Sequence, residues 1–119
     1  MESVINIQNK LDKLNIIRYN TVICAKIEEI NVKFLEGLKI LIDEGNDIND
    51  GYYEKIDELS NLARNNLNIH SKEDYDKAVA CIELADILIT RGIKDVDEEI
   101  LSSGFFNLKH NLNDLNIFS

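Results

Sequence analysis

Apolar residues recur every three to four positions along most of this 119-residue chain, which is the spacing of one face of an α-helix. The first face consists of Val4, Ile7, Leu11 and Leu14. The second face consists of Ile23, Ile27, Ile30, Phe34, Leu38 and Leu41. Arg18 and Thr21 separate the two faces. Residues 3–44 therefore form either two helices that meet at an N-cap at Asn20 or Thr21, or one long helix that changes its buried side. A bend is favoured, because no glycine is present there to reverse the chain.

Glycine and capping residues mark the next boundaries. Gly45 predicts the end of the first element, and the polar segment 43–51 reads as the first loop. Asp50 is a suitable N-cap for a helix that follows it. Ser71 precedes Asp74 by three residues, which resembles a capping box and predicts another helix start.

The C-terminal third contains two more glycines at apparent boundaries. Gly92 predicts the end of the helix that begins after Ser71. Asp95 or Asp97 then starts a short acidic helix, and a last apolar face follows Gly104. The chain contains no proline, so no position forbids a helix. The predicted fold is all-α: a single domain over residues 1–119, packed as a compact bundle of five to six mainly antiparallel helices. We expect Phe34 and Phe105 to share its core.

Composition indicates where such a protein works. With 45% hydrophobic residues the chain can bury a core, and no apolar run is long enough to cross a membrane. The first residues lack the basic and apolar regions of a secretory signal. Cys24 and Cys81 lie among aliphatic residues without metal-ligand spacing, which predicts two reduced thiols. We therefore expect a cytoplasmic protein.

Negative charge is concentrated in the middle of the chain. The net charge is −9, and residues 43–99 hold sixteen acids against six bases. This excess disfavours nucleic-acid binding, which needs cations to replace the counterions of phosphates. It suits a basic protein surface. The residues expected to bind it are Asp47, Asp50, Glu54, Asp57 and Glu58.

The leading functional hypothesis is a small acidic helical binding protein of the immunity, antitoxin or inhibitor type. It would engage a basic protein partner and need no cofactor. No complete catalytic set is present, which favours a protein that is not an enzyme. A homodimer is left open.

Asp86 supports an alternative. Helical spacing places its carboxylate near the apolar face of its helix, where an unpaired charge is costly. It either forms an ion pair with a base on a facing helix, for which Lys55 is a candidate, or binds a metal ion together with Glu83.

The metal-binding interpretation of Asp86 agrees with a resemblance to a known family. Residues 54–64, EKIDELSNLAR, and residues 83–88, ELADIL, resemble the two halves of the signature of MazG-like all-α nucleotide pyrophosphatases, EExxE followed by ExxD. Lys55 stands where that family has its second glutamate. The resemblance covers about residues 52–90 and implies a Mg²⁺-dependent nucleoside triphosphate pyrophosphohydrolase, active or degenerate. Its implied metal ligands are Glu54, Glu58, Glu83 and Asp86.

A shorter resemblance overlaps the first. Residues 64–70, RNNLNIH, resemble the RNxxxxH motif of HEPN ribonucleases, which are also small helical bundles. The resemblance implies that Arg64 stabilises a phosphate and that His70 performs general acid–base catalysis.

Overall fold

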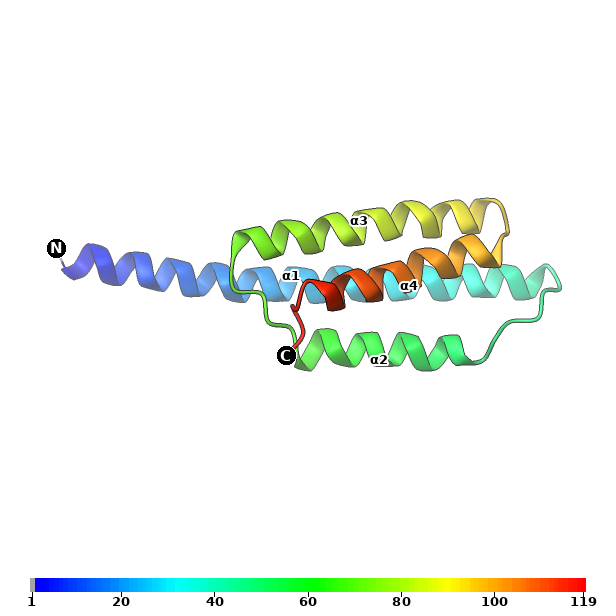
Figure 1. Cartoon of the computed structure of the whole chain (residues 1–119), viewed down its shortest axis with the longest axis horizontal. Helices are drawn as coiled ribbons and strands as arrows, with labels where there is room; N and C mark the ends of the chain where they lie inside the picture. Colours follow the sequence, from blue (N-terminus) through cyan, green and yellow to red (C-terminus); the bar gives the residue numbers. More distant parts are fainter. Residues whose placement is uncertain (1) are drawn as a thin grey trace.

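The computed structural model describes residues 2–119 and the side chains from Ser3 onward, and shows four helices. These are α1 (Glu2–Asp43), α2 (Gly51–Asn65), α3 (Lys72–Lys94) and α4 (Glu98–Asp114), which follow one another up and down along a common axis (Figure 1). The predicted all-α bundle is confirmed, but the expected count of five to six helices is wrong. The molecule measures 67 × 22 × 21 Å. None of the helices within residues 2–119 is long and apolar enough to cross a membrane.

Residues Glu2–Asp43 form one continuous helix, so of the two alternatives the single long helix is confirmed and the N-cap at Asn20 or Thr21 is wrong. The favoured bend there is not seen in Figure 1. Asn20 lies inside α1, and its side-chain amide contacts the connection between α2 and α3. Its Nδ2 donates to the carbonyl oxygens of Ile16 and Ile69, and its Oδ1 accepts from the backbone N–H of Ile69 at 3.0 Å. The polar residues that interrupt the apolar pattern therefore tether a loop instead of breaking the helix.

The two apolar faces of α1 point in different directions. At 100° per residue, the face of Val4, Ile7, Leu11 and Leu14 lies about 160° around the helix from the face that begins at Ile23. The second face is buried in the bundle, whereas the side chains of residues 3–15 are all exposed. We call residues 3–15 the N-terminal projection, because this part of α1 extends beyond the other helices (Figure 1).

Two glycines predicted as boundaries are instead packing positions. Gly104 lies within α4, where a Cβ would come 2.8 Å from the Cβ of Leu88 on α3. Gly92 lies in the last turn of α3, where a Cβ would come 2.5 Å from the backbone nitrogen of Leu101. Their lack of a side chain lets α3 and α4 approach closely, and the two helices predicted on either side of Gly104 are one. Asp97 caps this helix by accepting from the N–H of Glu99 at 2.9 Å.

The other helix ends agree partly with expectation. Gly45, at φ 89°, follows α1, and Ser71 Oγ accepts from the N–H of Asp74 at 3.1 Å as the capping pattern predicts. Asp50 occupies the N-cap position of α2, but its side chain makes no capping hydrogen bond. Instead, Asn49 Oδ1 accepts from the first N–H of α2 at 2.8 Å.

The core is built around an aromatic pair. Phe34 of α1 and Phe105 of α4 are fully buried, with ring centroids 4.4 Å apart in a stacked arrangement. The prediction that their two apolar faces share one core is confirmed. Ile69 and Ile117 add the α2–α3 connection and the C-terminal tail to this core. Both segments lie at the end of the bundle opposite the α1–α2 and α3–α4 connections (Figure 1).

Candidate functional site

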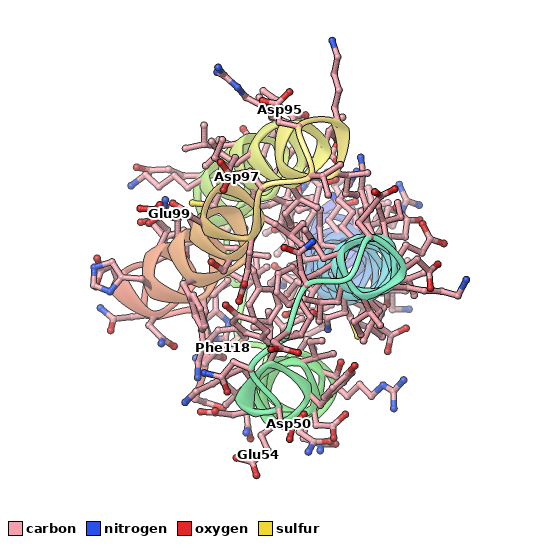
Figure 2. All side chains as sticks on the ribbon, turned by 90° about the vertical axis from the view of Figure 1, so that its right-hand side faces the viewer. Asp50, Glu54, Asp95, Asp97, Glu99 and Phe118 are labelled. Atoms are coloured by element: carbon pink, nitrogen blue, oxygen red, sulfur yellow. The ribbon has the colours of Figure 1, made fainter. Side chains whose placement is uncertain are left out.

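Two acidic segments meet at one end of the bundle. Residues 43–54, at the end of α1 and the start of α2, contain five acids and no Lys or Arg. Residues 95–99, at the turn between α3 and α4, contain four acids and no Lys or Arg. Figure 2 looks onto this end and shows Asp50 and Glu54 on one side and Asp95, Asp97 and Glu99 on another. We define the acidic end as Asp43, Glu44, Asp47, Asp50, Glu54, Asp95, Asp97, Glu98 and Glu99.

A hydrogen bond joins the two segments. The hydroxyl of Tyr52, in the first turn of α2, donates to Glu98 Oε1, in the first turn of α4, at 2.8 Å. Burial and this hydrogen bond to a carboxylate raise the pKa of the Tyr52 hydroxyl. The Tyr52 ring also packs edge-on against Phe34, with centroids 5.6 Å apart. The acidic end is therefore anchored to the core.

Sequence reasoning missed the contribution of residues 95–99 to this surface. The signal was present as the acidic run DVDEE at a helix start. In an up-and-down bundle the first and third connections lie at the same end, so the order of helices was enough to bring the two segments together.

The five predicted partner-binding residues have different surroundings. Asp47, Asp50 and Glu54 are exposed and belong to the acidic end. Asp57 is exposed farther along α2. Glu58 points toward α4, where Lys109 Nζ contacts its Oε1 at 2.8 Å. The hydrogen bond from Lys109 holds the pKa of the Glu58 carboxyl below its usual range.

Asp86 is half-exposed and forms an ion pair with Lys33 of α1, whose Nζ lies 2.6 Å from Asp86 Oδ1. The ion-pair interpretation thus holds, although the suggested partner was wrong. Lys55 instead lies 3.6 Å from Glu58 on its own helix. The expectation that Asp86 faces the core is also wrong. Its side chain lies at the edge of the contact between α1 and α3, where 49% of its surface is exposed.

The structure does not bring the four implied magnesium ligands together. Glu54 and Glu58 are on α2, Glu83 and Asp86 are on α3, and α1 and α4 lie between these two helices (Figures 1 and 2). Within residues 2–119, no group of three or more His, Cys, Asp and Glu side chains is arranged to hold a metal ion.

We expect Asp86→Asn to lower the free energy of unfolding by no more than about 1 kcal/mol, because the ion pair with Lys33 is partly exposed to solvent. Magnesium should leave the melting temperature of both proteins unchanged. Calorimetry of wild type and variant, with and without magnesium, checks this. A rise in melting temperature with magnesium that Asp86→Asn abolishes would support the pyrophosphatase hypothesis instead.

The two residues of the ribonuclease resemblance line different cavities. Arg64 pairs with Glu28 of α1 and lines a cavity of about 430 Å³ between α1 and α2. His70 is exposed and lines a separate cavity with Asp12 and Lys72. The arginine and the histidine therefore do not share one cavity.

The two cysteines are free and partly buried. Burial raises the pKa of both thiols, which disfavours the reactive thiolate. Neither cysteine has the surroundings of a nucleophile.

Comparison with protein-family models, with curated proteins and with solved structures finds no match to this chain.

Proposed function

We propose that this protein is a small acidic helical binding protein, of the immunity, antitoxin or inhibitor type, whose acidic end engages a basic surface of a protein partner. One observation carries this proposal: residues 43–54 and 95–99, which together contain nine acids and no Lys or Arg, lie at the same end of the bundle (Figure 1). A concentration of one sign of charge raises the rate of encounter with an oppositely charged surface.

Helix stability explains only part of this charge. Carboxylates in the first turns of α2 and α4 interact favourably with the positive ends of those helices. Asp43 and Glu44 instead lie at the negative end of α1, whose last turn contains no base. Lys39, one turn earlier, pairs with Asp43 at 3.5 Å and offsets that charge, so it is Glu44 whose position helix stability does not explain.

Rigidity also favours recognition. The Tyr52–Glu98 hydrogen bond and the cap formed by Asp97 hold the two acidic segments in place. A pre-organised surface loses less conformational entropy when a partner binds.

Charge reversal at Asp47 and Glu54 tests the proposal. Because both side chains are exposed, the double variant Asp47→Lys, Glu54→Lys should fold normally. Binding should be measured with the product of the neighbouring gene as the partner, by surface plasmon resonance. We expect the association rate to fall about 10-fold or more at about 0.01 M ionic strength, and much less at about 1 M, where salt screens charges beyond a few ångströms.

A double variant with the same charge change elsewhere serves as the control. Glu83 and Asp114 are exposed and lie outside the acidic end, so Glu83→Lys, Asp114→Lys should leave the salt dependence close to that of wild type. Equal effects of the two double variants would show that only net charge matters. Unchanged binding in both would remove the acidic end from consideration.

A further inference from the structure

The side of α1 that faces away from the bundle carries a regular stripe of side chains spaced alternately three and four residues apart. This is the a and d spacing of a coiled coil. The outer stripe consists of Val4, Ile7, Leu11, Leu14, Arg18, Thr21, Ala25, Glu28, Val32, Leu35, Lys39 and Ile42. Glu28 is partly exposed and the other members are exposed. The seven large aliphatic side chains expose between 38% and 66% of their surface.

The large aliphatic members of this stripe stay exposed in the monomer, whereas at its centre Arg64 of α2 pairs with Glu28. From Val4 to Ile42 the stripe spans about 57 Å at 1.5 Å per residue. Exposed aliphatic side chains gather toward both ends of the stripe, and exposed apolar patches of this kind mark interaction surfaces.

We propose that the outer stripe binds the outer stripe of a second copy of this chain. The two α1 helices would be antiparallel, related by a two-fold axis that crosses between the stripes at the level of residue 23. In this register, residue i faces residue 46 − i of the second copy. The facing pairs, named with the residue of the second copy last, are Val4–Ile42, Ile7–Lys39, Leu11–Leu35, Leu14–Val32, Arg18–Glu28 and Thr21–Ala25.

These pairs are complementary in size and charge. Aliphatic side chains face one another toward both ends, and the small residues Thr21 and Ala25 meet at the axis, where the helices come closest. Arg18 faces Glu28, which also pairs with Arg64 of its own chain, and the two-fold symmetry forms this arrangement twice. The aliphatic stem of Lys39 can cover Ile7 while its ammonium group stays in water.

Charge excludes the parallel alternative. In a parallel pair each stripe residue faces its own copy, so Arg18, Glu28 and Lys39 would each meet a like charge. The antiparallel register removes all three conflicts. The net charges of the facing segments also favour the antiparallel register. Residues 3–18 carry three bases and one acid, and they face residues 28–43, which carry four acids and two bases.

The same register covers the N-terminal projection. Residues 3–15 of one copy lie along residues 31–43 of the other, where Val32 and Leu35 are exposed. At the centre of the stripe Thr21, Ala25 and Glu28 border the cavity between α1 and α2, so the partner helix would lie beside α2 there. The seam drifts by about 20° per heptad around a straight helix, so the two helices should cross at about 20°.

Sedimentation equilibrium tests the association. We expect wild type to be a dimer at about 100 µM protein, and Leu14→Glu or Val32→Glu to raise the dissociation constant at least about 100-fold, because each buries an unpaired charge. Both residues are exposed in the monomer, so circular dichroism should show an unchanged fold. Ile87→Glu, at an equally exposed position on α3, is the matched control and should remain dimeric. A monomeric wild type, or a dimer that tolerates both stripe variants, would overturn the proposal.

A distance measurement tests the orientation. A spin label on Asn9→Cys, in a protein with Cys24→Ala and Cys81→Ala, should give a separation of about 42 Å between copies in the antiparallel register. A parallel pair would place the same labels within about 20 Å, since helix axes lie about 8–10 Å apart. The short distance would refute the antiparallel register.

Discussion

Replacing Phe34 by alanine is expected to lower the free energy of unfolding by about 3–5 kcal/mol. The Phe34 ring is fully buried, stacks on Phe105 at 4.4 Å and contacts Tyr52 edge-on at 5.6 Å. Removing it leaves a cavity between α1 and α4 that a tightly packed bundle cannot refill. Domains of this size have total stabilities of about 5–15 kcal/mol, so this one substitution threatens the folded state.

Urea titration and calorimetry measure this effect, with Phe106→Ala as the matched control. Phe106 is 40% exposed, so its loss should cost much less than the loss of Phe34. We expect the melting temperature of Phe34→Ala to fall by about 10 °C or more. A fall of less than about 2 °C would show that the aromatic pair is not the centre of the core.

Replacing Gly92 by alanine is expected to cost about 2–3 kcal/mol or more, although it adds only one methyl group. The new Cβ would lie 2.5 Å from the backbone nitrogen and 2.6 Å from the Cα of Leu101. Backbone atoms cannot rotate away as a side-chain end can, so α3 and the first turns of α4 would have to separate. That shift would loosen the packing of Leu101, which is fully buried.

The same change at Gly51 is the control for Gly92→Ala. Gly51 opens α2, and a Cβ there would meet only the side chain of Asn49, at 3.1 Å. Since alanine also has the higher helix propensity, Gly51→Ala should stay within about 0.5 kcal/mol of wild type. If Gly92→Ala were equally neutral in chemical denaturation, the close approach of α3 and α4 would be wrong.

The local sequence pattern was enough to predict features that depend only on a residue and its near neighbours in the chain. The apolar face from Ile23 to Leu41 predicted which side of α1 is buried, because residues three and four apart on a helix must share a side. The ends at Gly45 and Ser71 were also predictable, since capping is decided by backbone conformation and by hydrogen bonds within one turn.

The acidic end could be predicted only in part from the local sequence pattern. Its first segment was recognisable from Asp47 to Glu54, but the second segment, residues 95–99, joins it only because the bundle folds the chain up and down. The Tyr52–Glu98 hydrogen bond connects residues 46 positions apart, and the Lys33–Asp86 ion pair connects residues 53 positions apart. No pattern within one helix specifies such partners.

By itself, the sequence determined that this protein is helical, which face of each helix is apolar and where most of its negative charge lies, because these properties depend on composition and on the period of the helix. Only the tertiary structure decided what each apolar face meets. Gly92 and Gly104 allow helices to touch instead of ending them, and the face from Val4 to Leu14 remains uncovered. The physical reason is that the bundle buries only the side of a helix that contacts the other helices. Which side this is depends on residues far away in the chain.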